Sequence, residues 1–173
     1  MKVRTRMCMS ADGFVTTPDG WPAQLADPAF DPRTFGFVAF QEQCDAVLMG
    51  RTTFEPALGA EQWPWSNVDV FVLGSHRPAG TPDTVVFDSD PTRLLEKLRA
   101  ANRGGDVHVV GGPRTVETYR TLGALDELGL IVLPLLLGDG MQLTPSVSTD
   151  TSLTLSSGRV LPSGAVEILY DVN

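Results

Sequence analysis

The sequence predicts an α/β protein in which helices flank a largely parallel sheet and an antiparallel hairpin ends the chain. The first observation is a series of short, wholly apolar runs in the middle of the chain, such as DAVLMG and VDVFVLG. The second is that helix signals and short connections alternate with these runs. The third is the end of the chain, where two alternating segments flank a turn that contains glycine. With 173 residues, the chain is expected to form one domain over residues 1–173.

The N-terminal part is expected to contain a strand, a loop and a helix. KVRTRMCMS alternates polar and apolar residues, which indicates a strand, and the turn residues of SADG end it. Residues 16–32 are rich in Pro, Asp and Gly but carry Trp21, which is typical of a functional loop. Asp31 and Pro32 form an N-cap and first-turn pair, so we expect a helix from there to Cys44.

The middle of the chain is expected to alternate strands and helices. DAVLMG, VDVFVLG and TVVF are typical of strands that are buried on both faces, and Thr53 is a candidate cap for a short helical turn after the first of them. DSDPTRLLEKLRAAN predicts a helix that is capped by Asp90. Its apolar stripe consists of Leu94, Leu95, Leu98 and Ala101. VHVVGG predicts a further strand, and PRTVETYRTL predicts a helix that is closed by Gly123.

The last part of the chain is expected to be all strand. ELGLIVLPLLLG predicts a long strand that Pro134 interrupts. TSLTLSSGRVLPSGAVEILYDV predicts two alternating strands joined by a turn, which is the pattern of an antiparallel hairpin.

The composition is that of an ordinary globular protein, with 42% hydrophobic and 20% charged residues. Asp and Glu outnumber Lys and Arg by 21 to 13, so a nucleic-acid or membrane surface is not an expected partner. The apolar runs are shorter than the roughly 20 residues of a membrane helix, and no signal-peptide core follows the N-terminus. Cys8 and Cys44 lack a CxxC spacing and are expected to be buried free thiols. We therefore expect a cytoplasmic protein.

The stretch DVHVVGGPRTVETY places two glycines between a strand and a helix. A helix N-terminus presents unpaired N–H groups and a partial positive charge, and glycine permits an anion to approach closely. Gly111, Gly112 and Pro113 would form such a site, and Arg114 and Thr115 would add charge and a hydroxyl donor. The alternative is a glycine pair that only lets the helix pack closely on the sheet. Neither GxGxxG nor GxxxxGK[ST] is present.

Two further strand ends carry groups that bind anions. MGRTT ends one buried strand and LGSHR ends another. Because the carboxyl ends of parallel strands lie along one edge of the sheet, the three segments are expected to bind one extended ligand with several phosphates. The alternative is that these arginines are only solvated surface residues.

Four motifs in the same order resemble the dihydrofolate reductase superfamily, namely SADG, DAVLMGRTTFE, VHVVGG and LDELGLIVLPLLLGDG. They are most similar to the reductase domain of the bacterial bifunctional riboflavin-biosynthesis deaminase-reductase. The resemblance covers nearly the whole chain. It implies a three-layer fold with a mixed, mostly parallel sheet of about eight strands, a homodimer, a small-molecule substrate and NADPH as the hydride donor.

The resemblance also implies which residues bind the cofactor. Those near its phosphates are Gly50, Arg51, Thr52 and Thr53; those near the adenosine 2′-phosphate are Ser75, His76 and Arg77; those around the pyrophosphate are Val110, Gly111, Gly112, Pro113, Arg114 and Thr115. Ala11 is expected near the nicotinamide. A 2′-phosphate favours guanidinium groups where an NAD site favours a carboxylate, so Arg77 and Arg51 favour NADPH over NADH.

The candidate catalytic residue is Asp12, which would orient the substrate or relay a proton; its alternative role is to cap its own turn. Ser10 and Gly138 are expected at the substrate pocket by resemblance. Trp21 is a candidate wall for a flat heterocycle, although aromatic residues are more often core, and Arg33 is a candidate partner for a substrate phosphate. No metal is required, and no group of residues indicates a metal site.

Two departures from the family narrow the function. In dihydrofolate reductases a carboxylate in the first helix binds the pterin, but the matching region here is residues 34–37, and Asp31 lies nearly one turn too early. The zinc deaminase signatures H-x-E and P-C-x-x-C are absent, so deamination is not an expected activity. The expected function is therefore that of an NADPH-dependent reductase of a small heterocyclic or imine-like substrate, such as a pyrimidine ribosylamine phosphate of riboflavin biosynthesis or a pterin. The alternative is a non-catalytic module that binds NADP(H) or a phosphorylated metabolite.

Overall fold

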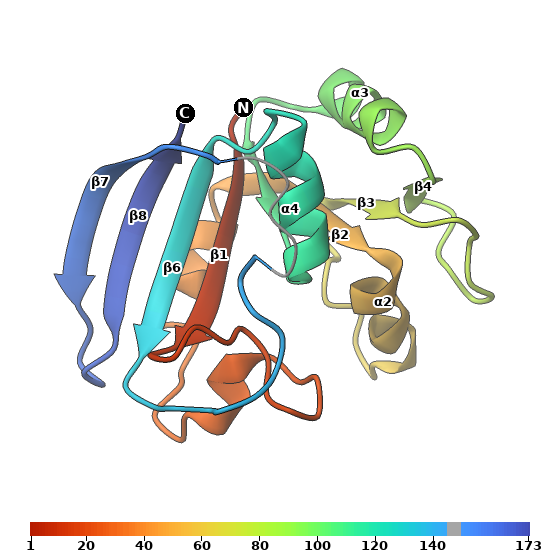
Figure 1. Ribbon diagram of the computed structural model, residues 1–173. Helices are drawn as coiled ribbons and strands as arrows, with labels where there is room; N and C mark the ends of the chain where they lie inside the picture. Colours follow the sequence, from red (N-terminus) through yellow and green to blue (C-terminus); the bar gives the residue numbers. More distant parts are fainter. Residues whose placement is uncertain (145–149) are drawn as a thin grey trace.

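One eight-stranded sheet forms the centre of the protein in its computed structural model, which describes residues 1–144 and 150–173 (Figure 1). The strands are β1 (Val3–Ser10), β2 (Cys44–Gly50), β3 (Asp69–Leu73), β4 (Val86–Asp88), β5 (Asp106–Val109), β6 (Glu127–Leu133), β7 (Leu153–Val160) and β8 (Val166–Val172). The helices are η1 (Ala23–Ala26), α1 (Phe37–Gln41), α2 (Arg51–Phe54), η2 (Glu55–Gly59), α3 (Pro91–Ala101) and α4 (Pro113–Thr121), where η denotes a 3₁₀ helix.

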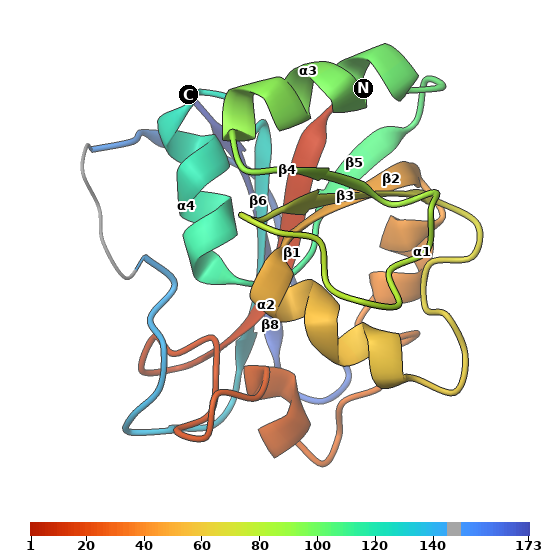
Figure 2. The same cartoon turned by 90° about the vertical axis from the view of Figure 1, so that its right-hand side faces the viewer.

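The strand order is β4-β3-β2-β5-β1-β6-β8-β7. All pairs from β4 to β6 are parallel, and only β8 runs antiparallel to its neighbours β6 and β7. Helices α1 and α2 and the 3₁₀ segments pack on one face, and α3 and α4 pack on the other (Figure 2). This confirms the predicted α/β fold with a mostly parallel sheet, flanking helices and an antiparallel C-terminal hairpin.

The two faces of the sheet carry separate cores, because successive side chains of a strand point to opposite sides. In β2, Leu48 packs with Phe71 and the leucines of α3 in one cluster. Its neighbour Met49 packs with Phe54 of α2 in another. The apolar runs of β2 and β3 are therefore buried on both faces, as their composition predicts, whereas β4, formed from the TVVF run, is only half-buried.

Helix α3 begins and packs as the sequence predicts. The Asp90 carboxylate accepts hydrogen bonds from the backbone N–H groups of Thr92 and Arg93, at 2.8 and 3.1 Å, so it caps the helix. Leu94, Leu95 and Leu98 are buried, whereas Ala101 is exposed at the helix end. Helix α4 ends at Thr121, and Gly123 just beyond it has a φ of 62°, the left-handed conformation that closes a helix.

Two predicted helix starts are wrong. Helix α1 begins at Phe37 and not after Asp31, because Gly36 has a φ of 73° and interrupts the helical conformation. Asp31 instead accepts a 3.1 Å hydrogen bond from the N–H of Arg33 within a turn. Thr53 does not cap α2 but lies inside it, since the N-cap position is Gly50.

The strand that was expected to continue past Pro134 ends before it. Residues Glu127–Leu133 pair with both β1 and β8, and Pro134 has no N–H to continue a ladder. The C-terminal hairpin forms as expected, with a register shift between Leu155 and Ser157 in β7. All eight residues of β7 are exposed, and β7 and β8 extend beyond the helices at the left of Figure 1.

Two cysteines and two aromatic residues near the sheet are buried or half-buried. Cys8 and Cys44 are buried free thiols, as predicted, and burial raises the pKa of Cys8 to about 12. Phe35 is 1% exposed, and its ring lies 5.1 Å from that of Phe30 in an edge-to-face arrangement, so these two rings belong to the core.

In residues 1–144 and 150–173, no helix is long and apolar enough to cross a bilayer.

Candidate functional site

The ends of three neighbouring strands lie side by side at one edge of the sheet. The order β3-β2-β5 brings together the ends of three adjacent parallel strands. Gly74 directly follows β3, Gly50 is the last residue of β2, and Gly111 lies two residues after β5. The edge continues along the sheet with the ends of β1 and β6. The topology therefore brings together the three segments whose groups are expected to bind anions.

The starts of α2 and α4 meet at this edge. A Cβ atom built on Gly50 would lie 2.7 Å from Oγ1 of Thr115, which is closer than side chains approach one another. A Cβ atom on Gly112 would lie 3.2 Å from Oγ1 of Thr53, and the φ of 62° at Gly112 favours glycine in any case. The two threonine hydroxyls therefore lie so close to the backbone of Gly50 and Gly112 that no side chain fits at these two positions.

The N-terminus of α4 leaves backbone donors unused. Thr115 and Val116 both donate to the carbonyl of Gly112, at 2.8 and 3.3 Å. Within residues 1–144 and 150–173, no partner is found for the N–H groups of Gly111, Gly112 or Arg114. Pro113, the first residue of the helix, is buried and has no N–H. This nine-residue helix therefore presents free donors and the positive end of its dipole next to a glycine pair.

Arg51 lies between the ends of β2 and β3. Its guanidinium is 2.5 Å from the Glu55 carboxylate, one turn further along. A Cβ atom on Gly74 would lie 2.9 Å from Cβ of Arg51, so the glycine allows this side chain to cross the end of β3. The Arg51 side chain keeps 29% of its surface exposed, and Thr52 next to it is exposed.

The Ser75–His76–Arg77 segment is exposed beyond β3. Oγ of Ser75 and Nδ1 of His76 are 3.4 Å apart. Arg77 bends back and donates hydrogen bonds to the carbonyls of Val85 and Pro82, at 2.8 and 2.5 Å. Arginine has five N–H donors, so the guanidinium holds the 78–85 loop and still has donors for an anion.

Asp12 lies in the turn after β1 and binds the segment that follows β6. Its carboxylate accepts hydrogen bonds from the N–H groups of Gly138 and Leu137, at 2.7 and 3.1 Å. The Ser10 hydroxyl, together with these two N–H groups, lowers the pKa of Asp12 to about 2. This carboxylate, held ionised by these partners, joins the turn after β1 to the 137–138 segment.

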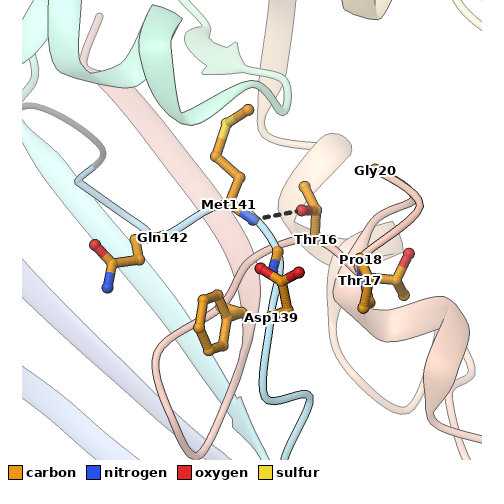
Figure 3. A pocket seen from close by; sticks show the side chains of 9 residues that line it. Thr16, Thr17, Pro18, Gly20, Asp139, Met141 and Gln142 are labelled. Carbon is orange, nitrogen blue, oxygen red and sulfur yellow. Dashed lines mark hydrogen bonds between the residues drawn. The ribbon is translucent and has the colours of Figure 1, made fainter.

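An open cleft of about 580 Å³ lies between the loop after β1 and residues 139–142 (Figure 3). Thr16 and Met141 both line it and are in direct contact, since the Met141 N–H donates a 2.8 Å hydrogen bond to Oγ1 of Thr16. A Cβ atom on Gly140 would lie 2.2 Å from the Thr16 carbonyl oxygen, so only glycine allows this approach. The lining residues are Phe14, Thr16, Thr17, Pro18, Gly20, Asp139, Gly140, Met141 and Gln142.

The remaining candidate site residues are Trp21, Ala11, Val110 and Arg33. The backbone of Trp21 is hydrogen-bonded to Thr17, which lines the cleft, and Trp21 is 62% exposed. Ala11 donates to the Leu135 carbonyl at 2.9 Å, beside the Asp12 turn. Val110 follows β5, donates to the Leu48 carbonyl at 2.8 Å and directly precedes the glycine pair. Arg33 is exposed in the turn before α1 and does not line the cleft.

The cleft walls were not identified from the sequence. Thr16 and Met141 are 125 positions apart, and neither is a residue type that indicates chemistry by itself. The available signals were weaker: the Pro-, Asp- and Gly-rich loop that starts at Thr16, and the GDG turn before Met141. Over the ranges 1–144 and 150–173, no group of three His, Cys, Asp or Glu side chains is placed to hold a metal ion.

Comparisons with known proteins agree with this architecture. Residues 1–166 match the family described as the RibD C-terminal domain. A relative from Bacillus subtilis (strain 168), the protein YyaP, is 27% identical over 180 residues that span 96% of this chain and 93% of that protein.

Solved structures show the same fold. A protein from Shewanella sp. PV-4, described as a riboflavin biosynthesis protein, has a TM-score of 0.82 at 24% identity, with 100% of this chain and 99% of that chain covered. The diaminohydroxyphosphoribosylaminopyrimidine deaminase/5-amino-6-(5-phosphoribosylamino)uracil reductase from Thermotoga maritima has a TM-score of 0.72 at 14% identity. That alignment covers 98% of this chain and 56% of the other.

Proposed function

Since the chain belongs to the family of RibD C-terminal domains, which are reductase-like, we propose that it is an NADPH-dependent reductase of a small heterocyclic or imine-like substrate. A pyrimidine ribosylamine phosphate of riboflavin biosynthesis and a pterin are the candidate substrates. The observation that carries the proposal is the free N–H cradle at the start of α4, which lies against Gly50 and Thr53 at the carboxyl edge of the sheet.

The residues at this edge fit a dinucleotide with several phosphates. The N–H groups of Gly111, Gly112 and Arg114 would hold the pyrophosphate, because they are unpaired and lie at the positive end of a helix. The hydroxyls of Thr53 and Thr115 would add donors from two segments that meet there. Arg77 would pair with the 2′-phosphate through donors that the 78–85 loop leaves free.

NADPH, when bound, supplies a hydride, and the protein holds the coenzyme and the substrate in position. The cleft that Thr16 and Met141 line is large enough for a heterocyclic ring, since small-molecule sites commonly enclose about 300–1,000 Å³. Asp12 keeps the 137–138 segment next to the β1 turn, so both walls of the cleft keep their positions. Fixed walls orient a bound ring.

The second candidate function is a module that binds NADP(H) or a phosphorylated metabolite without turnover. The observation in its favour is the lack of an evident proton donor in the described part of the cleft. Asp139 is the one titratable side chain among the cleft residues identified in the ranges 1–144 and 150–173, and Asp12 nearby is ionised at neutral pH. A binding module needs the phosphate cradle but no acid.

Titration with NADPH followed by turnover assays separates the two functions. We expect saturable binding by nicotinamide fluorescence and loss of the reduced-nicotinamide absorbance with a substrate. The substrates to test are 5-amino-6-(5-phosphoribosylamino)uracil, dihydropterins and quinoid compounds. Binding without consumption across this panel supports the non-catalytic module, and no detectable binding contradicts both functions.

Arg77→Ala tests the preference for the 2′-phosphate. We expect it to weaken NADPH binding about tenfold or more and to change NADH binding little, because only NADPH loses a charged partner. Arg33→Ala is the control, since Arg33 is also exposed but lies outside the sheet edge. The melting temperature of each variant shows whether loss of the hydrogen bonds to Val85 and Pro82 disturbs the fold. Equal weakening of both coenzymes would refute this placement of Arg77.

A further inference from the structure

The cleft that Thr16 and Met141 line has no cationic side chain to hold a phosphate. Within residues 1–144 and 150–173, its lining residues include no Lys, Arg or His, although one candidate substrate is a phosphate ester. Arg33, the expected partner for such a phosphate, does not line the cleft. The free N–H groups at the start of α4 are those expected to hold the coenzyme. Since phosphates bind to guanidinium or ammonium groups and helix N-termini, the described cleft is poorly suited to a phosphorylated substrate.

The charges at this cleft are negative. Asp139 is an exposed residue that lines the cleft in the 139–142 segment (Figure 3). Its Oδ1 accepts a 2.7 Å hydrogen bond from the N–H of Gly140, and in the part of the chain that the structure describes no partner is found for Oδ2. Asp12, which is ionised at neutral pH, binds the N–H of Gly138, the residue before Asp139. Together with the net charge of −8, these carboxylates favour a cation over an anion.

The uncharged walls of the cleft suit a flat ring. Phe14 is half-buried and offers an aromatic ring, which attracts both heterocycles and organic cations. Met141 is also half-buried, and its thioether is a favourable contact for an aromatic ring. Thr16 and Thr17 add hydroxyl groups, and Gln142 adds an exposed amide. A planar molecule with a positive charge therefore matches both these walls and the carboxylate.

A cationic substrate also needs no acid from the protein. Reduction of a neutral carbonyl or imine adds a hydride to carbon and a proton to the heteroatom, and an acid must supply that proton. In an iminium ion the hydride forms a C–H bond, and the electrons of the C=N π bond become the lone pair of a neutral amine. The hydride comes from NADPH, as the proposed function requires, and no proton enters the step.

We propose that the substrate of this cleft is a flat cationic heterocycle of the iminium class that carries no phosphate. Asp139 is the specificity-determining residue, because its carboxylate pairs with the ring cation, which lies beside the ring of Phe14. The inference rests on the proposed reductase function and narrows its substrates, since a ribosylamine phosphate is an anion. It also explains how a reductase site can work without a proton donor.

Calorimetry without coenzyme tests the charge preference separately from the reductase function. The probe is N-methyldihydroisoquinolinium, an iminium ion, and it is compared with N-methyldihydroisoquinolinone, a neutral lactam of nearly the same shape. We expect the cation to bind about tenfold more tightly than the lactam, and this difference to shrink at high salt. The phosphate ester 5-amino-6-(5-phosphoribosylamino)uracil should bind more weakly than its dephosphorylated form. Equal affinities for cation and lactam, or tighter binding of the phosphate ester, would overturn the proposal.

Asp139→Asn tests whether this carboxylate sets the preference. We expect the variant to bind the cation and the lactam equally, with the affinity for the lactam unchanged. Glu96→Gln is the control, since it also removes one carboxylate, from an exposed position on α3. Helix α3 lies at the opposite end of the molecule from the 139–142 segment (Figure 1), so this variant should keep the preference. A preference for the cation that survives in folded Asp139→Asn contradicts the assignment.

Turnover with NADPH distinguishes failure of this inference from failure of the reductase function. We expect the iminium ion to be reduced at a rate that is constant between about pH 6 and pH 8 and equal in heavy water, because no proton enters the step. A rate that falls several-fold in heavy water would overturn the inference. Consumption of NADPH with the phosphate ester alone would support a reductase but contradict this substrate class. Tight binding of the cation without any consumption would contradict the reductase function while the charge preference of the cleft stands.

Discussion

At the residue scale, Asp12 shows how a carboxylate at a loop junction contributes to stability. Its folded-state pKa of about 2 lies below that of an unfolded aspartate, near 3.9, so the ionised form is favoured by folding. The resulting stabilisation is present above about pH 4 and is lost as the pH falls through about 2.

We predict that Asp12→Asn lowers the melting temperature at pH 7, and that the difference from the wild type disappears between about pH 4 and pH 2. Thermal melts across this range measure both effects. Asp19→Asn, in the exposed 18–20 turn, is the control and should show neither effect. A reduction rate that titrates between pH 5 and 8 in the wild type, but not in Asp12→Asn, would show instead that Asp12 transfers a proton.

Gly112 and Gly123 allow a controlled test of the expected phosphate site at the start of α4. Both have a φ of 62°, but a Cβ atom on Gly112 would meet Thr53, whereas one on Gly123 would meet nothing within 4 Å. We predict that alanine at either position costs about 1 kcal/mol of stability through backbone strain. Only Gly112→Ala should also weaken NADPH binding, by about tenfold or more. Calorimetry of both variants provides the comparison, and equal loss of affinity would remove Gly112 from the site.

At the scale of elements, a buried charge cluster connects β1, β7 and β8. Arg6 of β1 and Arg159 of β7 both bind the Glu167 carboxylate of β8. Arg6 also donates a 2.5 Å hydrogen bond to the Phe35 carbonyl, in the turn before α1. Arg6 and Glu167 are 7% and 5% exposed, whereas the Arg159 side chain is 60% exposed. The hairpin is thereby joined to the centre of the sheet across β6.

We predict that Glu167→Gln destabilises the protein by about 3 kcal/mol or more, because it leaves the buried Arg6 without a counterion. Arg159→Gln should cost about 1 kcal/mol or less, since that partner is exposed to solvent. Urea unfolding of the two variants measures the difference. Similar losses from both substitutions would mean that the cluster behaves as a surface pair.

The predictability of each element depends on whether its signal is local. Helix α3 was predicted correctly because Asp90, Pro91 and the leucine stripe all lie within its own sequence. Helix α1 was placed too early because Asp31 and Pro32 suit a helix start, whereas the left-handed conformation of Gly36 depends on the surrounding structure. A Cβ atom there would lie 2.9 Å from the Arg6 guanidinium, a contact between distant segments that no sequence pattern shows.

At the scale of the whole molecule, the strand ends that form the site followed from the α/β pattern. Parallel strands end at the same edge of a sheet, so the glycines at the ends of β2, β3 and β5 were expected to lie close to one another. The cleft was not predictable in the same way, because it depends on how the loop at Thr16 meets the turn at Met141.

We propose that two copies of the chain associate through β7, the last strand of the sheet. Among residues 1–144 and 150–173 its outer backbone edge has no strand partner, and Leu155 and Val160 are 61% and 74% exposed. Light scattering should give a dimer for the wild type and a monomer for Leu155→Lys. Leu25→Lys is the control, since Leu25 is 63% exposed on another part of the surface. A monomeric wild type, or a dimeric Leu155→Lys variant, would contradict the proposal.

The placement of β1 between β5 and β6 affects how the protein is synthesised. Val3 pairs with Val107, and Arg4 pairs with Glu127, so β1 is translated well before the strands on either side of it. Nascent chains that end before β6 expose an apolar segment with an unpaired edge on at least one side. The centre of the sheet therefore closes only after β6 has been translated.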